Sequence, residues 1–349
     1  MRLIIIINHI SREVISLLKE IKSKFEKRIF IFSILAIIML VLSGCGAKEN
    51  NTDSAKDTSA VSADVETVEA EEVEEVREIQ HAMGVTEVKG TPQRVVILTN
   101  EGTEALLALG IKPVGAVRSW TGEPWYDHIK DEMTGVQELG FENEPNFEAI
   151  LELDPDLIIG NKVRHEEAYE QLSKIAPTVF SEDLSGQWKI NFELYADTLN
   201  KKAEGELVMK AFDDRVAEAK ETLGDKEEIK VSVVRFSAKD VRIYQKDTFS
   251  GVLLEQMGVG RPESQDVDNF METVSEEAME TMDGDILFYW VTEADVYEKA
   301  NQWLENPVFK SLNVSKTNQV FEVNETIWNT AGGIKAANLL LDDVVERLK

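Results

Sequence analysis

Apolar runs and amphipathic stretches alternate along the chain from about residue 79 onward. Short apolar runs that end in polar or turn residues predict buried strands, and apolar positions at helical spacing between them predict helices. The predicted elements are, in chain order, strand 94–98, helix 101–109, strand 113–117, helix 147–153 with Asn146 as its cap, strand 156–160, helix 165–174 and strand 178–180. Strands that alternate with helices indicate βα units and a mainly parallel sheet.

Residues 191–224 have a different pattern. Apolar positions continue at helical spacing without a proline until Gly224, which predicts one long helix. Beyond it the first pattern returns, with strands over 229–236 and 241–244. Residues 251–262 echo 104–113, and residues 275–288 echo 146–159. Two similar α/β halves separated by one helix indicate an internal duplication.

The N-terminal segment has the layout of an export signal. A basic cluster that ends at Arg28 precedes an apolar run over 29–42, and Leu42, Ser43 and Gly44 then lead to Cys45, the only cysteine. The run is too short for an ordinary membrane span. This layout resembles a bacterial lipobox, in which Cys45 is lipidated after residues 1–44 are removed. A signal anchor with an incidental cysteine is the alternative, and the true start within residues 1–28 stays open.

Residues 45–76 are poor in large apolar side chains and rich in acidic ones. Such a composition predicts a disordered, self-repelling tether, with a solvated helix over 65–76 as the alternative. Either form acts as a spacer.

Composition excludes several classes of protein. The 349 residues include 65 Asp plus Glu against 37 Lys plus Arg, a formal net charge of −28 that argues against a nucleic-acid binder. One cysteine excludes a disulfide framework and a cysteine zinc site, and four scattered histidines argue against a histidine-rich metal centre. The sequence contains no phosphate-binding loop and no nucleophile elbow, so nothing in it predicts an enzyme.

Several stretches together resemble the substrate-binding lipoproteins of iron–siderophore ABC importers. The matching segments are 91–98, 104–115, 146–159, 162–165 and 328–343. The resemblance implies an α/β protein with two Rossmann-like lobes joined by one long α-helix, the class III periplasmic-binding-protein-like fold. It places the N-terminal lobe at 77–190, the joining helix at 191–224 and the C-terminal lobe at 225–349, with the ligand in the cleft between the lobes.

Candidate ligand-binding residues are basic or aromatic, because donors suit the oxygen-rich surface of a ferric siderophore and rings suit its skeleton. Arg118 and Trp120 follow the strand 113–117 at its expected ligand-facing edge. Arg235 interrupts an apolar strand, where a charge is costly unless it faces a partner or a cleft. An internal salt bridge is the alternative for Arg235, and packing within the lobe is the alternative for the loop aromatics.

The resemblance adds Trp328, and weaker candidates are Arg164 and Tyr244; a core position is the alternative for Trp328. It also implies that Glu148 and Glu255 dock on the permease dimer. A solvated helix face is the alternative for both glutamates, since acidic residues are abundant in this chain.

We therefore expect a monomeric, extracytoplasmic lipoprotein, lipid-anchored through Cys45. It is expected to have no cofactor and to deliver a ferric siderophore to an ABC permease with its ATPase. A hydroxamate or citrate–hydroxamate is favoured over a tris-catecholate, which would require a denser basic cluster. The alternatives are a cobalamin or haem binder on the same fold, with His165 and Met271 or Tyr244 as haem ligands, a cell-surface siderophore esterase, and a purely structural lipoprotein.

Overall fold

The first half of the fold is organised around a five-stranded parallel sheet. The computed structural model describes residues 75–349, so the expectations for the signal peptide, for Cys45 and for most of the tether lie outside the described residues. The strand order is β5-β4-β3-β8-β9, and all four pairings are parallel. The strands are β3 (Val95–Ile97), β4 (Gly115–Ala116), β5 (Gln137–Glu138), β8 (Leu157–Asn161) and β9 (Thr178–Ser181). The strands β3 and β8 and the edge strand β9 are buried throughout, as expected for a parallel sheet that is covered on both faces.

Short capped helices connect these strands. The side chain of Thr99 caps α2 (Asn100–Ala108), and the side chain of Asn146 caps α3 (Phe147–Glu152) as predicted. The helix expected over 165–174 is divided into α4 (Lys162–His165), η1 (Glu166–Ala168) and α5 (Tyr169–Leu172). Two hairpins complete this half: β1 (Val76–His81) with β2 (Gly84–Lys89), and β6 (Gly140–Phe141) with β7 (Glu144–Pro145).

The single helix predicted over 191–224 is wrong, because two helices occupy this stretch. After η2 (Ser185–Gln187), α6 covers Trp188–Thr198 and α7 covers Lys202–Leu223. Asn200 has a φ of 56° between them, and the amides of Asn200 and Lys201 bond back to the carbonyls of Asp197 and Ala196. This pattern is a Schellman motif, which ends a helix without proline or glycine.

The second half has a mixed sheet with the strand order β13-β11-β10-β14-β15. Its strands are β10 (Lys226–Phe236), β11 (Val241–Tyr244), β13 (Met271–Val274), β14 (Ile286–Val291) and β15 (Val320–Glu322), and β12 (Val259–Gly260) pairs with β10. β14 pairs in parallel with β10 and β15, whereas the β10–β11 and β11–β13 pairings are antiparallel. The second half therefore repeats the α/β character of the first but not its all-parallel sheet.

The helices of the second half are mostly short. They are α8 (Phe249–Gln256), η3 (Glu276–Met282), η4 (Ala294–Val296), α9 (Tyr297–Glu305), α10 (Pro307–Ser311), α11 (Asn313–Lys316), η5 (Thr326–Thr330) and α12 (Ile334–Leu348). The C-terminal helix α12 packs against α2 of the first half as well as against α7 and α8.

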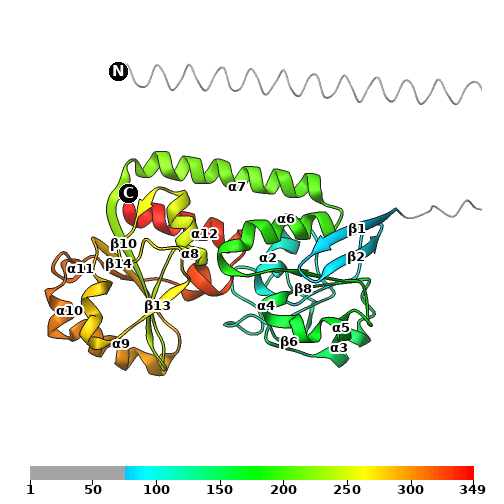
Figure 1. Ribbon diagram of the computed structural model, residues 1–349, viewed down its shortest axis with the longest axis horizontal. Coiled ribbons are helices and arrows are strands. Elements are labelled where there is room, and N and C mark those ends of the chain that lie inside the picture. The colour runs from blue at the N-terminus through cyan, green and yellow to red at the C-terminus, as the bar shows by residue number, and fades with distance from the viewer. Residues whose placement is uncertain (1–74) are drawn as a thin grey trace, which may run out of the picture. The chain divides into compact units, whose positions relative to one another are not determined.

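One hydrophobic core joins the two halves through the long helices. Figure 1 shows α7 lying along one side of the molecule, next to α6 and α12. Phe192 of α6, Phe212 of α7 and Leu340 of α12 belong to the same buried cluster as Val95 of β3 and Phe288 of β14. Both sheets therefore pack against the same hydrophobic core, and this packing fixes the strand ends that carry the site residues.

Candidate ligand-binding cleft

A cavity of about 460 Å³ is lined by residues from both halves of the fold. The first half contributes side chains that follow β3, β4, β6, β8 and β9, and the second half contributes residues of β10 and β11 and of the segment before α12. The lining includes Glu101, Trp120, Thr121, Glu142, Arg164, Ser185, Arg235, Arg242, Tyr244, Phe270, Glu293, Glu325 and Asn329. Its size and mixed polar and aromatic character fit a small-molecule site.

Two arginines from the second half lie side by side in the cavity wall. Arg235 of β10 and Arg242 of β11 are partners across the antiparallel pair, so their side chains leave the same face of the sheet. Arg242 donates to Asp240 at 2.8 Å, but the buried Nε atoms of both arginines have no hydrogen-bond partner among the described residues. Like charges opposite each other are unfavourable. An anion bound between the two guanidinium groups would therefore reduce their repulsion.

Aromatic rings lie next to these arginines. Tyr244 follows Arg242 at the next position on the same face of β11, and its ring centroid lies 5.0 Å from that of Trp290 and 5.5 Å from that of Phe270. Burial raises the pKa of the Tyr244 hydroxyl, which therefore stays neutral. Across the cavity, Trp120 is 39% exposed and stands 6.2 Å from the ring of Phe141.

Carboxyl groups form the other part of the wall. Glu142 accepts from the backbone and side chain of Asn100, at 3.1 and 2.9 Å, and from Arg164 Nε at 3.3 Å. Burial raises the pKa of Glu101 to about 8, and the nearby charge of Glu142 adds to the shift. Burial also raises the pKa of Glu325 to about 7, although Arg235 opposes that shift. Near neutral pH the site therefore holds partly protonated acids beside its arginines.

The structure places four of the six predicted ligand-binding residues in the lining: Trp120, Arg164, Arg235 and Tyr244. Arg118 is outside it. Its guanidinium group lies 5.0 Å from the centre of the Phe141 ring and its Nη2 lies 3.4 Å from Glu123. Arg118 thus supports the aromatic pair formed by Trp120 and Phe141 instead of lining the cavity.

The expected ligand contact of Trp328 is contradicted by its position. Its side chain is completely buried in the core, where its ring centroid lies 4.8 Å from that of Phe288 and its Nε1 donates to Asp343 at 2.7 Å. An indole that packs on a β14 side chain and bonds to α12 has no face available for a ligand. Its neighbours Asn329 and Thr330 line the cavity in its place.

Sequence reasoning missed Arg242 and the buried acids. Arg242 and Tyr244 lie two positions apart on a short strand, so their side chains share one face. This spacing was a signal for Arg242 in the sequence. Glu101 lies in the first turn of α2, shortly after the end of β3, where the carboxyl edge of a parallel sheet usually carries ligand-binding groups. The abundance of Asp and Glu along the chain hid that signal.

The predicted docking residues lie on exposed helix positions. Glu148 occupies the first turn of α3 and is exposed. Glu255 lies near the end of α8 with a 62% exposed side chain, and Lys246 Nζ approaches its Oε1 at 3.6 Å. Their exposure leaves both free to contact a partner, and the docking role stays a prediction.

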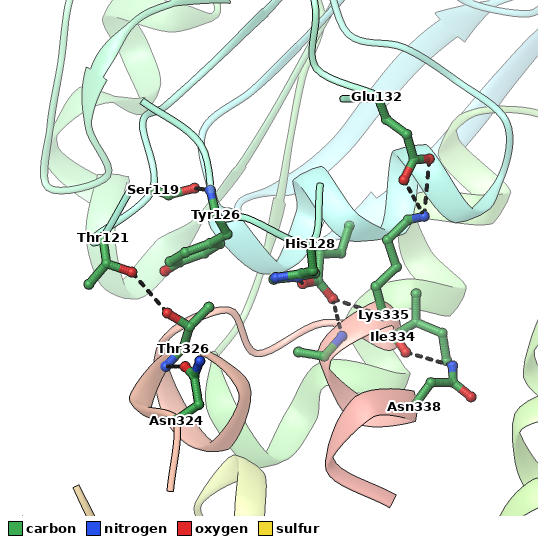
Figure 2. A network of polar contacts seen from close by, with 12 residues as sticks. Ser119, Thr121, Tyr126, His128, Glu132, Asn324, Thr326, Ile334, Lys335 and Asn338 are labelled. Atoms are coloured by element: carbon green, nitrogen blue, oxygen red, sulfur yellow. Dashed lines mark hydrogen bonds and ion pairs between the residues drawn. The ribbon is translucent and has the colours of Figure 1, made fainter. Parts of the chain in front are cut away.

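A polar network beside the cavity connects the loop after β4 with the segment 324–338. The hydroxyl groups of Thr121 and Thr326 lie 2.8 Å apart, and Lys335 Nζ bonds to Glu132 at 2.9 and 3.1 Å (Figure 2). Glu104 of α2 accepts hydrogen bonds at 2.8 Å from the backbone amides of Lys335 and Ala336. These contacts hold the N-terminus of α12 against the first half.

The described residues offer little to a resident metal or haem. Among residues 75–349 no group of three or more His, Cys, Asp or Glu side chains could hold a metal ion. The proposed haem ligand His165 already uses both ring nitrogens, with Nδ1 accepting from the amide of Asn161 at 3.1 Å and Nε2 lying 2.6 Å from the carbonyl of Glu142. In the same part of the chain no helix combines the length and apolarity that crossing a membrane requires.

The fold and the cleft together define the class of protein. Residues 95–326 match the model of the periplasmic binding protein family, and the chain belongs to this family of substrate-binding proteins. The resemblance seen in the sequence is thereby confirmed, as is the two-lobed α/β fold class.

Individual relatives are similar over nearly their whole length. The chain is 47% identical to the probable siderophore-binding lipoprotein YfiY of Bacillus subtilis, over 91% of this chain and 97% of that one. It is 29% identical to the Fe(3+)-citrate-binding protein YfmC of the same organism, over 93% of this chain and 98% of the relative. The crystal structure of Staphylococcus aureus SirA complexed with staphyloferrin B is 37% identical, covers 78% of this chain and 98% of its own, and superposes with a TM-score of 0.73.

Proposed function

We propose that this protein captures a ferric siderophore in the cleft and delivers it to an ABC permease with its ATPase. The observation that carries the proposal is the arginine pair of Arg235 and Arg242, which line the cavity from adjacent strands beside aromatic rings, and whose buried Nε donors have no partner among the described residues. Iron bound by carboxylate or hydroxamate oxygens presents the acceptors that such donors need. The printed names of YfiY, YfmC and SirA support a siderophore or ferric citrate as the ligand class.

Within that class we favour a citrate-type or citrate–hydroxamate chelate. Three arginines line the cavity, Arg164, Arg235 and Arg242, but Arg164 and Arg242 already bond to carboxylates. The free positive charge is therefore modest. A tris-catecholate complex, with about three negative charges, would leave more charge uncompensated in a partly buried site.

The remaining features of the proposal concern delivery. Residues 77–190 and 225–349 serve as the two lobes, and the exposed Glu148 and Glu255 contact the permease. Lipid on Cys45 holds the protein at the outer face of the membrane, and the acidic segment 45–76 gives the lobes reach. The protein acts as a monomer and carries out no covalent chemistry.

Titration of tryptophan fluorescence tests the proposal directly, since Trp120 lines the cavity and an iron complex bound there quenches it. The panel contains ferric citrate, a ferric trihydroxamate, a ferric tris-catecholate and each chelator without iron. We expect saturable quenching by the citrate or hydroxamate complexes. Quenching by the catecholate alone would overturn the ligand class, and no quenching by any ferric complex would overturn the function.

Substitution of one arginine of the pair tests its contribution to binding. A hydrogen bond to a charged group contributes roughly 1.5–3 kcal/mol, so Arg235→Ala is expected to weaken binding about 10- to 150-fold. The matched control is Lys210→Ala on the exposed face of α7, which removes one positive charge and an exposed ion pair with Asp214. An equal effect of both substitutions would show that Arg235 acts only through net charge.

A further inference from the structure

Glu101 is a deeply buried ionisable side chain in the cavity lining, and one oxygen of its carboxyl group has no hydrogen-bond partner among the described residues. The residue lies in the first turn of α2 and is only 6% exposed, yet it lines the cavity. Its Oε1 accepts from Asn191 Nδ2 at 2.8 Å and from the Tyr195 hydroxyl at 3.2 Å. Its Oε2 is buried and has no hydrogen-bond partner within the described chain. Buried polar atoms in proteins nearly always have a partner, and because Glu101 lines the cavity, a bound ligand is in a position to supply one.

The surrounding bonds fix which oxygen can carry a proton. Asn191 Nδ2 also donates to the carbonyl of Asp183 at 2.7 Å, so the amide nitrogen, and not the amide oxygen, faces Glu101. Oε1 of Glu101 is therefore held as an acceptor. When the carboxyl group is neutral, its proton resides on Oε2, the atom without a partner.

The charged groups around Glu101 favour that neutral form. Glu142 lies on the neighbouring hairpin and Asp183 follows β9, and both repel a negative charge on Glu101. Arg164 pairs with Glu142 and leaves Glu101 without a cation of its own, and the facing group of α6 is the neutral Tyr195. Burial is the largest cause of the raised pKa, which is about 8.

We propose that Glu101 contacts the bound chelate as a neutral acid and donates a hydrogen bond from Oε2 to one of its carboxylate or hydroxamate oxygens. This inference rests on the proposed function, because it names a specificity-determining contact within the same cleft. An ionised Glu101 would repel the anion that Arg235 and Arg242 attract. A neutral donor instead adds to their recognition of oxygen acceptors and disfavours ligands that present an ammonium group at this point.

Two variants separate this role from its alternatives. Glu101→Gln keeps an acceptor for Asn191 and Tyr195 and replaces the Oε2 proton with an amide donor. Glu101→Ala removes both. With ferric citrate and a ferric trihydroxamate as probes, we expect E101Q to bind within about threefold of the wild type at pH 6, and E101A to bind about 10- to 100-fold more weakly. Circular dichroism of each variant reports whether the fold is retained.

The pH dependence of the binding affinity distinguishes this role from a merely structural one, which would not change the ratio of the two affinities with pH. A group with a pKa near 8 is roughly nine-tenths ionised at pH 9, so the wild type should bind about tenfold more weakly than E101Q there, although the two match at pH 6. The ratio of wild type to E101Q at each pH cancels the protonation of the chelate itself and of Glu325.

The outcomes are distinct. A wild type that binds no ferric chelate overturns the proposed function. A wild type that binds, together with a folded E101A of equal affinity, overturns only the role of Glu101. If E101Q loses as much affinity as E101A at pH 6, the carboxylate acts as an anion toward a cationic group of the ligand, and the donor role is wrong.

Discussion

Removal of the Glu104 carboxylate should destabilise the protein more than any other single change in the network around α12. This side chain is completely buried, and its Oε2 accepts from the backbone amides of Lys335 and Ala336, both at 2.8 Å. These amides belong to the first turn of α12, which has no intrahelical partners for them. The carboxylate also bonds to His128 Nε2 through Oε1. Figure 2 shows His128 near the start of α12, where the side chain of Lys335 extends toward Glu132.

The magnitude follows from these bonds. Glu104→Ala removes hydrogen bonds that are worth roughly 1.5–3 kcal/mol each and leaves two amides of α12 without an acceptor, so we expect a loss of about 3–5 kcal/mol. Glu104→Gln keeps an oxygen that accepts from both amides and places an amide group beside the His128 ring nitrogen. Its cost is therefore about 1–2 kcal/mol.

Urea unfolding followed by tryptophan fluorescence measures both variants. The control is Glu132→Ala, which breaks the ion pair with Lys335 in the same network but at a 46% exposed side chain, and should cost about 0–1 kcal/mol. If Glu104→Ala costs no more than Glu132→Ala, then the amides of α12 find other acceptors and the network does not hold the two halves together.

Three further predictions follow from the same structure. The pKa of Glu101 rises from 4.5 to about 8 on folding, so its stabilising contribution is complete below pH 4.5 and is lost as the pH rises through 8. Urea unfolding should therefore show wild-type stability falling by about 2–3 kcal/mol relative to E101Q between about pH 5.5 and 7.5, and parallel curves would contradict the burial of this acid. Gly205→Ala should destabilise the protein by about 1–3 kcal/mol, although alanine normally stabilises a helix interior, because the added Cβ would lie 2.6 Å from Ala196 Cβ; an increase in stability would show that α6 and α7 separate easily. A protein with both Glu148→Ala and Glu255→Ala should bind ferric chelate normally but support little iron uptake by cells, whereas normal uptake would remove these residues from the docking surface.

Local patterns predicted much of the first half because local physics determines it. Val95–Ile97 of the predicted strand 94–98 form the buried strand β3, and Asn146 caps α3 with its own side chain. Arg235 was found for a physical reason as well, since a charge within an apolar strand needs a partner or a cavity, and it lines the cavity.

The wrong or missed predictions depend on features that the periodicity of the sequence does not show. The apolar pattern runs through Asn200 without interruption, and only the left-handed backbone there ends α6. Trp328 precedes Gly332 and Gly333, which permit close backbone approach, and it resembles a pocket residue of the family, but packing against Phe288 and a bond to Asp343 place it in the core. Burial of Glu101 depends on α6, which is distant in the sequence, so its position after β3 alone did not distinguish it from the other acids.

The distribution of charge is compatible with the proposed capture of an anionic chelate by an acidic protein. The formal net charge of −28 repels a negatively charged chelate at long range, but this repulsion is screened beyond about 8 Å at physiological ionic strength. Inside the cavity, Arg235 and Arg242 are held together by adjacent strands, and the pKa values of Glu101 and Glu325 are raised so that neither is fully ionised near neutral pH. Burial thus reduces the negative charge of Glu101 and Glu325 inside the cavity, while the acidic side chains on the surface stay ionised. We therefore expect affinity to depend on short-range donors within the cleft, and so on the arrangement of oxygens on the chelate as well as on its net charge.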